Sequence, residues 1–461
     1  MLTYELKKAP GLPLYESLYR CIRADILSGA LAPGDKLPSK RALAEHLEVS
    51  KVTVEGAYAQ LLSEGYIRSE EKVGYFVEET GLLRPVTPVA APPEPERPGW
   101  LIDLTSNAAP GFPFSVWMKL QRQVMLDYGD KLLSPLPGQG YPELRQAIAE
   151  HLAAFRNMHI DPANILIGAG TDFLYNLLLQ LLGRDKVYAV EEPGYRKIRQ
   201  IYAAGGVRSI SAPMDSEGVI PQGLVDAHVL HCSPSHHFPT GIVTPVRRRQ
   251  QLLEWAAAAE ERYIIEDDYD SEFRFHAHPV PALQTMDRNG RVIYVNTFSK
   301  TLAPSIRISY MILPPALMAR FRQKLGFYSC TVPSFEQYTL ARFLSQGYFE
   351  KHINRMRKFY RNRRNLVIDL LQGSPFARRV TILEQDAGLH FLLRVDTDRP
   401  DGALTARCAK CGIRVQALSE FYEGTVPEWA AHCLVINYSG VNEENLPLAL
   451  EALARTLEND S

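Results

Sequence analysis

The stretch VNTFSKTLAPSIRISYMILP, residues 295–314, decides how the larger part of this chain folds. An apolar run of the kind that forms a buried strand ends at Ser299 and Lys300, and Arg307 stands alone in the apolar residues that follow. A buried lysine or arginine costs free energy unless a partner balances its charge. We therefore expect Lys300 and Arg307 to meet a covalent or anionic ligand that satisfies both.

Further apolar runs resemble this one, and helical patterns separate several of them. We expect strands within residues 164–170, 186–195, 227–236, 262–270, 291–300 and 308–314, and helices within 172–183, 196–206 and 246–261. This alternation predicts an α/β fold with a mostly parallel sheet. In such sheets ligands bind beyond the carboxyl ends of the strands, which is where the polar sequences SPSHH, EDDYD and SK lie.

A lysine at a strand end can form a Schiff base with an aldehyde. Pyridoxal 5′-phosphate is an aldehyde cofactor that uses such a lysine and also needs a carboxylate at its pyridinium nitrogen. Asp267 follows a predicted buried strand and meets that need, and Tyr269, two residues later, is placed to bond the ring hydroxyl. Tyr195 in EEPGY is placed to cover one face of the ring.

The phosphate of this cofactor requires a cation together with hydroxyl and backbone donors. Arg307 supplies the cation, and Thr297 and Ser299 flank the lysine with hydroxyl groups. Gly170 and Thr171 in GAGTD open a predicted helix, and a helix N-terminus attracts anions. The sequence therefore predicts a pyridoxal phosphate site with Lys300 as its catalytic residue.

Residues 81–99 carry six prolines, which predicts a stiff, extended linker over residues 81–100. It separates a head, residues 1–80, from a body, residues 101–461. The head shows helical patterns over 14–29, 39–47 and 50–65 and then a β-ribbon over 66–79, with Gly74 near its bend. This order predicts a winged helix-turn-helix.

The second helix of a helix-turn-helix presents its N-terminus to DNA, where Ser50, Lys51 and Thr53 lie. Residues 1–80 contain ten Lys and Arg against twelve Asp and Glu, so charge alone leaves a protein-binding module as the alternative. The sequence LPSKRALAEHLEVSKVTVEGAYAQLLSEGYIRSEEKVGYFV resembles the DNA-binding domain of GntR-type bacterial regulators. By position, the resemblance implies DNA contacts from Ser39, Arg41, Ser50, Lys51, Thr53 and Gly74.

The body carries a second resemblance. EEPGY, SPSHHFPTG, EDDYDSEFRF and NTFSKTLAPSIRISYMILP are similar to fold-type I aminotransferases, and more closely to the aminotransferase-like domain of MocR-type regulators. The resemblance spans about residues 101–455. It implies a pyridoxal-phosphate-dependent transcription regulator that forms a domain-swapped homodimer, with operator DNA as a partner and RNA polymerase as a further candidate.

Two positions depart from the aminotransferase pattern. Phe238 stands where an Asn usually contacts the cofactor, so that contact is lost or is taken over by His236 or His237. The C-terminal Arg that usually binds a substrate carboxylate is also replaced, because the matching run CLVINYSG offers Val435. The candidates for binding an effector carboxylate in its place are Arg414 and Lys197.

The bulk composition excludes several classes of protein. The net charge of −1 gives no overall attraction to nucleic acid, and 46% hydrophobic residues with 22% charged residues are typical of a globular protein. The six scattered cysteines indicate a reducing compartment, the cytoplasm, and neither Cys408-x-x-Cys411 nor the pair His276 and His278 completes a metal site. We expect no signal peptide and no membrane span.

Two functions follow from these features. In the first, the chain is a DNA-binding regulator that senses an amine, an amino acid or pyridoxal phosphate itself through an aldimine at Lys300. In the second, it is a working aminotransferase whose head assists assembly, and Lys300 is the general acid and base. Visible absorption, amino-acid turnover and promoter binding together distinguish them.

Overall fold

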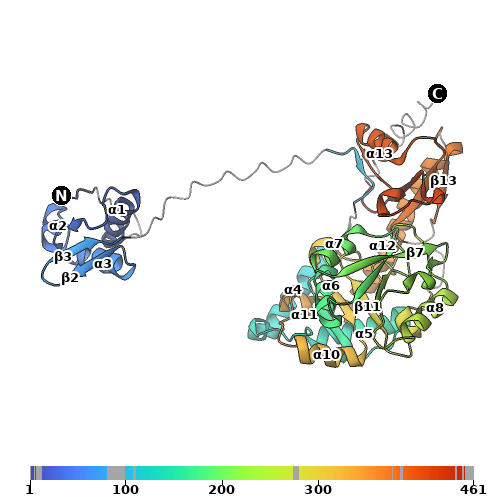
Figure 1. Cartoon of the computed structure of the whole chain (residues 1–461), viewed down its shortest axis with the longest axis horizontal. Helices are drawn as coiled ribbons and strands as arrows, with labels where there is room; N and C mark the ends of the chain where they lie inside the picture. Colours follow the sequence, from blue (N-terminus) through green and yellow to red (C-terminus); the bar gives the residue numbers. More distant parts are fainter. Residues whose placement is uncertain are drawn as a thin grey trace. The chain divides into compact units, whose positions relative to one another are not determined.

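The structure is a computed structural model that describes residues 2–4, 6, 13–79, 99–106, 111–273, 280–375, 377–384, 388–441, 444–448 and 451. The chain divides into two compact units, Met1–Arg97 and Pro98–Ser461 (Figure 1). Apart from positions 99 and 100, the predicted linker lies outside the described residues, and so do His276 and His278.

The first unit has the predicted order of helices and strands. Its elements are α1 (Leu14–Ser28), β1 (Lys36–Leu37), α2 (Lys40–His46), α3 (Lys51–Ser63), β2 (Ile67–Glu70) and β3 (Gly74–Val77). Gly29 ends α1 in the left-handed region at φ 83°, where glycine is the favoured residue. Ser39 and Ser50 cap α2 and α3, each accepting a hydrogen bond from a first-turn backbone N–H. The winged helix-turn-helix is confirmed.

One buried cluster holds the three helices of the head to its small sheet. Leu18 and Ile22 of α1, Val54 and Leu61 of α3, and Val77 of β3 are all fully buried in it. The sheet has the order β1-β3-β2, so the two-residue strand β1, which the sequence did not predict, pairs with the edge of the wing. This packing leaves the N-termini of α2 and α3 at the surface.

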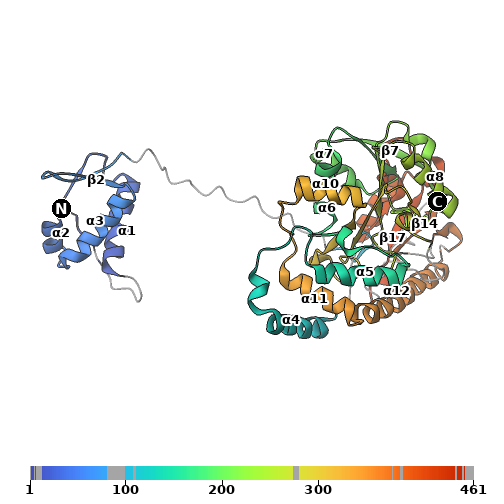
Figure 2. The same ribbon diagram turned by 90° about the horizontal axis from the view of Figure 1, so that it is seen from below.

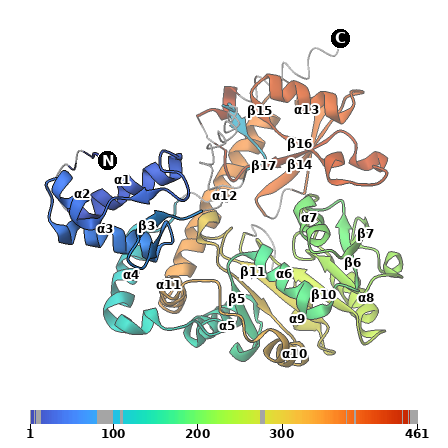
Figure 3. The ribbon, with the colours of Figure 1, turned by 60° about the vertical axis from the view of Figure 1, so that its left-hand side comes forward.

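The second unit is built on an eight-stranded sheet of order β5-β12-β11-β10-β9-β6-β7-β8 (Figure 3). The strands are β5 (Ile165–Gly168), β6 (Val187–Glu192), β7 (Arg208–Asp215), β8 (Gly218–Val219), β9 (Val229–Cys232), β10 (Tyr263–Asp267), β11 (Val292–Thr297) and β12 (Ser309–Ile312). The five neighbours from β11 to β7 are parallel, and β12 and β8 are antiparallel to the strands beside them. All six predicted strands are present, and the mostly parallel sheet is confirmed.

Helices cover both faces of this sheet, which explains why its strands are apolar throughout. Along β11, Ile293 and Val295 pack with α6 (Thr171–Leu182), α7 (Arg196–Ala204) and α10 (Pro315–Leu325). Tyr294 points the other way, towards α5 (Pro142–Arg156), α11 (Ser334–Ser345) and α12 (Tyr348–Gln372). Figure 2 shows these two groups of helices on opposite sides. The helices α4, α8 and α9 span Phe114–Tyr128, Val246–Ala257 and Leu283–Met286.

A second, smaller sheet follows in the chain. It contains β13 (Val380–Leu383), β14 (His390–Val395), β17 (Cys433–Asn437) and β16 (Gln416–Ala417) in that order, and α13 (Asp401–Lys410) lies beside it (Figure 3). β15 (Ile413–Arg414) pairs in parallel with β4 (Ile102–Asp103), so the start of the body returns to this end of the molecule. Within the described ranges, no helix is both long enough and apolar enough to cross a membrane.

Candidate functional site

A cavity of about 400 Å³ lies at the carboxyl ends of β6, β9, β10 and β11, as the sequence predicted. The N-termini of α6 and α7 and residues of β14 and β17 complete its wall, so both sheets contribute. Nine of the predicted body residues line it, namely Thr171, Tyr195, Lys197, Asp267, Tyr269, Thr297, Ser299, Lys300 and Arg307. Gly170 and Arg414 are not part of the lining.

Lys300 follows β11 in a short turn that holds its ammonium group at the cavity. Its Nζ lies 6.0 Å from the centre of the Tyr269 ring. Burial lowers the pKa of Lys300 to about 8, although the carboxylates of Asp270 and Asp267 oppose this shift. A lysine that is partly neutral near pH 7 is a better nucleophile than an ordinary one.

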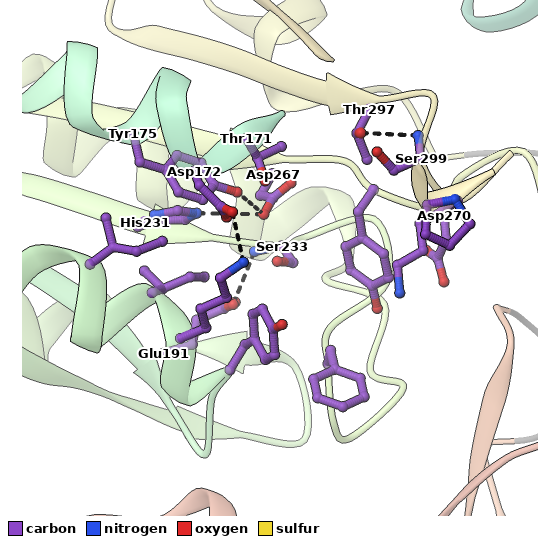
Figure 4. A pocket seen from close by; sticks show the side chains of 18 of the residues that line it. Thr171, Asp172, Tyr175, Glu191, His231, Ser233, Asp267, Asp270, Thr297 and Ser299 are labelled. Atoms are coloured by element: carbon purple, nitrogen blue, oxygen red, sulfur yellow. Dashed lines mark hydrogen bonds and ion pairs between the residues drawn. The ribbon is translucent and has the colours of Figure 1, made fainter. Parts of the chain in front are cut away.

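Thr297 positions the turn that carries Lys300. Its Oγ1 accepts a hydrogen bond from the Ser299 backbone N–H at 3.1 Å (Figure 4). It also accepts one from the Ser309 hydroxyl at 2.8 Å. The Ser299 hydroxyl is buried and has no hydrogen-bond partner in the part of the chain that the structure describes. Of the two hydroxyl groups predicted to meet a phosphate, Ser299 is therefore the available one, and Thr297 orders the backbone.

Asp267 ends β10 with its carboxylate in a network of buried rings. Its Oδ2 accepts a hydrogen bond from the Tyr175 hydroxyl at 2.6 Å and lies 3.7 Å from His231 Nε2 (Figure 4). The Tyr202 hydroxyl, whose pKa burial raises, lies 2.6 Å from Nδ1 of the same His231 ring. Asp267 Oδ1 is buried and unpartnered among the described residues.

Arg307 and the N-terminus of α6 meet at the predicted phosphate position. Arg307 has φ 52° and Gly170 has φ 92°, both in the left-handed region. A Cβ on Gly170 would lie 2.0 Å from a guanidinium nitrogen of Arg307, so only glycine allows this approach. Thr171 begins α6 beside them, and the helix dipole adds to the positive potential of the arginine.

Two aromatic rings also form part of the cavity wall. The rings of Tyr195 and Phe238 meet edge to face with 5.9 Å between their centres, and both line the cavity. His236 and His237 do not line it, because their Nδ1 atoms bind Asp270 at 2.8 Å and Thr240 at 2.7 Å. Phe238 therefore lines the cavity, whereas the two histidines that follow the same strand do not.

The two predicted carboxylate-binding residues differ in position. Lys197 lies in the first turn of α7 and forms an ion pair with Asp172, Nζ to Oδ2 2.7 Å. Asp172 Oδ2 is also 3.2 Å from Arg307, so one carboxylate holds both cations. Arg414 is 54% exposed on β15 and pairs with Asp103 at 3.3 Å, so the structure does not bring it to the cavity.

Sequence reasoning missed several lining residues, including Glu191, His231, His390 and Asn437. Glu191 precedes the last residue of β6, and burial raises its pKa to about 8 although the Ser233 N–H donates to it at 3.0 Å. Burial also lowers the pKa of His390. A polar residue near a strand end was the signal that found Asp267, and the same signal marks Glu191. His390 and Asn437 come from a different sheet, and no local sequence pattern predicts that they line this cavity.

These groups fit pyridoxal phosphate. The unpartnered Oδ1 of Asp267 is an acceptor for a ring N–H, Ser299 and Arg307 are donors for phosphate oxygens, and glycine keeps the phosphate position open. Within the described ranges, which include Cys408 and Cys411, no three His, Cys, Asp or Glu side chains converge as metal ligands.

The predicted DNA-contacting residues belong to the N-terminal ends of α2 and α3 and to the start of β3. Ser50 Oγ accepts from the Thr53 N–H at 3.2 Å and is 2.8 Å from Thr53 Oγ1, while Lys51 pairs with Glu55 at 3.4 Å on the exposed surface. Arg41 is exposed in the first turn of α2. Gly74 opens β3 at φ 141°, and a Cβ there would lie 3.1 Å from the Lys36 side chain.

Comparisons with known proteins cover nearly the whole chain. The family model for aminotransferase class I and II matches residues 100–453, and the model for bacterial regulatory proteins of the gntR family matches residues 14–77. The uncharacterized HTH-type transcriptional regulator YdeL of Bacillus subtilis is 36% identical over 461 residues, covering 98% of each chain. The probable rhizopine catabolism regulatory protein MocR of Rhizobium meliloti is 30% identical, covering 97% of this chain and 94% of that one.

Solved structures resemble the body. The crystal structure of an archaeal alanine:glyoxylate aminotransferase matches with a TM-score of 0.69 and 22% identity, covering 78% of this chain and 91% of that chain. At this identity the likeness shows the fold alone, which is the predicted type I aminotransferase fold.

Proposed function

Because the chain belongs to the MocR-type family of regulators, in which a gntR-family head precedes an aminotransferase class I and II body, we propose that it senses its signal through Lys300. The protein is a DNA-binding transcription regulator, and pyridoxal 5′-phosphate is its cofactor. The observation that carries the proposal is the convergence of Lys300, Asp267 and Arg307 on one cavity.

Each of these residues has a separate task in the proposal. Pyridoxal phosphate supplies, when bound, an aldehyde that bonds covalently to amines. The partly neutral Lys300 offers the amine of the protein itself, and Asp267 Oδ1 accepts the ring N–H and balances its charge. Arg307, Ser299 and the first turn of α6, which begins at Gly170 and Thr171, bind the phosphate. Tyr195 covers the ring and Tyr269 bonds its hydroxyl.

The head binds operator DNA in this proposal, with base and phosphate contacts from the helix starts and the wing. The contacting residues are Ser39, Arg41, Ser50, Lys51, Thr53 and Gly74. The signal is an amine, an amino acid or pyridoxal phosphate itself, and binding it favours one conformation of the body over another. We place the protein in the cytoplasm, where DNA and RNA polymerase, its further candidate partner, are present.

A homodimer is also part of the proposal. Near the start of the body, α4 and the turn after it expose several large apolar side chains. They are Phe114 at 70% exposure, Met118 at 66%, Leu126 at 74% and Leu133 at 75%. Several exposed large apolar side chains on one stretch of chain are typical of an interface between subunits. A Leu126→Glu substitution should yield monomers in light scattering, whereas an unchanged dimer mass would place the interface elsewhere.

Reduction with borohydride tests the central claim. Protein purified with pyridoxal phosphate and then reduced should carry a pyridoxyl group on Lys300, identified by mass spectrometry of its peptides. Lys300→Ala should lose both the adduct and the visible absorption while keeping the circular dichroism of the fold. An adduct on another lysine, or an unchanged absorption band in the variant, would refute the assignment.

Operator binding distinguishes the regulator from an aminotransferase with an assembly head. The full-length protein should shift DNA from the region upstream of its own gene or a neighbouring gene at nanomolar concentration, and it should turn over amino acids slowly. Fast multiple turnover together with no affinity for such DNA would favour the enzyme instead.

A further inference from the structure

The charged groups that line the cavity are balanced before any cofactor binds. Among the described lining residues there are three cations, Lys197, Lys300 and Arg307. Three aspartates, at positions 172, 267 and 270, face them, and the fourth lining carboxyl, Glu191, has a pKa that burial raises to about 8, which favours its neutral form at pH 7. A phosphate that enters this cavity brings further negative charge, so the loaded cavity has no surplus of positive charge for a second anion.

Two of the three cations are committed to the cofactor if the proposed function holds. Lys300 carries the covalent bond and Arg307 carries the phosphate. Lys197 is then the remaining cation in the described lining. Its Nζ lies 2.7 Å from Asp172 Oδ2, the distance of a charge-assisted hydrogen bond (Figure 4 shows the dashed line from Asp172).

The ion pair with Lys197 stabilises the Asp172 carboxylate more when the phosphate is present than when it is absent. The same Oδ2 lies 3.2 Å from Arg307 in this structure. A bound phosphate takes a share of the arginine and adds negative charge close to the carboxylate of Asp172. Like charges this close repel, and Lys197 is the group that relieves the repulsion. The ion pair between Asp172 and Lys197 therefore tightens as the cofactor binds.

A ligand with a carboxylate would have to displace an internal carboxylate from Lys197. It would also leave Asp172 unpaired beside the phosphate. An amine without a carboxylate meets neither cost, and its carbon chain finds apolar neighbours in Tyr195, Phe238, Ile198 and Leu389, all of which line the cavity.

We propose that Asp172 occupies Lys197 and thereby makes the effector site selective for primary amines that lack a carboxylate. The inference rests on the proposed function, since it assigns Lys300 and Arg307 to the cofactor. Asp172 acts in it as a specificity-determining residue.

Butylamine and 4-aminobutanoate are the matched probes, because a carboxylate in the second replaces the terminal methyl group of the first. Full-length protein saturated with pyridoxal phosphate is titrated with each, by calorimetry and by the change in visible absorption. The wild-type protein should bind butylamine several-fold more tightly, because the side chains of the Lys197–Asp172 pair are 45% and 36% exposed and solvent weakens such a pair. Equal affinity, tighter binding of 4-aminobutanoate, or no response to either probe would overturn the inference.

Asp172→Asn tests the mechanism behind the selectivity. The amide keeps the shape of the side chain but releases Lys197, so affinity for 4-aminobutanoate should rise several-fold relative to the wild type. Adding Lys197→Met in the same chain should abolish that gain. A gain that persists in the double variant, or no gain in Asp172→Asn, would refute the role of the ion pair.

The absorption of the bound cofactor and the adduct on Lys300 are recorded for every variant. A failure of the proposed function appears as a missing adduct in the wild-type protein. A failure of this inference appears as the wrong order of affinities in protein whose adduct is present, so the two outcomes remain distinct.

Discussion

Raising the pH of the cofactor-free protein from 7 to 9 should increase the rate at which Lys300 captures pyridoxal phosphate by about tenfold, with a plateau above pH 9. The reason is the pKa of Lys300, which burial lowers to about 8. The nucleophile is the neutral amine, and at this pKa about one molecule in ten carries it at pH 7 and about nine in ten at pH 9. An ordinary lysine would be neutral in only about one molecule in 3,000 at pH 7.

The steepness of the profile is the quantity to measure. Stopped-flow absorbance gives the second-order rate constant at each pH, with the cofactor in excess over protein. A lysine with an ordinary pKa would instead give a rise of about 100-fold between pH 7 and 9, with no plateau. Such a profile would refute the claim that burial prepares Lys300 as a nucleophile.

An isosteric variant separates the titration of the protein from that of the cofactor. The negative charge of Asp270 raises the pKa of Lys300 and so opposes the effect of burial. Asp270→Asn removes that charge, and the midpoint of the profile should move to lower pH while the titration of free pyridoxal phosphate stays where it was. A midpoint that does not move would mean that the profile reports the cofactor.

Three further substitutions test individual residues. Asp267→Asn should weaken cofactor binding roughly 10- to 100-fold, because a hydrogen bond to a charged group contributes about 1.5–3 kcal/mol; an unaltered dissociation constant would count against its role at the ring nitrogen. Arg41→Ala should weaken operator binding by roughly 1–3 kcal/mol in a gel-shift titration, and unchanged affinity would move the contact elsewhere. Gly170→Ala should lower cofactor affinity by pushing on Arg307, whereas Gly206→Ala, at φ 74° with open space around it, should not; equal effects would exclude the steric explanation.

Much of the fold followed from local patterns. The caps at Ser39 and Ser50, the stop at Gly29 and the bend before Gly74 lie where the sequence indicated them, because capping and turn chemistry act within a few residues. The strand β1 was missed for the same reason. It has two residues and exists only because the edge of β3 is available to pair with it.

The candidate site likewise combines residues that a local rule predicts with residues that only the tertiary structure brings together. Asp267 and Lys300 stand at ends of neighbouring parallel strands, so a rule about strand ends brings them together. Asp172 was overlooked because its importance comes from two partners, 25 and 135 residues away in the chain, that share one of its oxygens. His231 lies within β9 and points at Asp267 only because β9 and β10 are adjacent. Strand order decides such contacts, and a single sequence does not state it.

The residues proposed to hold the cofactor belong to a different sheet from the residues proposed to respond to a signal. The groups proposed to hold pyridoxal phosphate, Lys300, Asp267 and Arg307, all belong to the large sheet and the loops at its edge. The opposite wall includes His390 and Asn437, from β14 and β17 of the smaller sheet. A ligand that touches only the first group has equal affinity for any arrangement of the two sheets and shifts nothing. We therefore propose, among the possible signals, an amine held at Lys300 with a carbon chain long enough to meet Leu389 and His390, since both residues line the cavity.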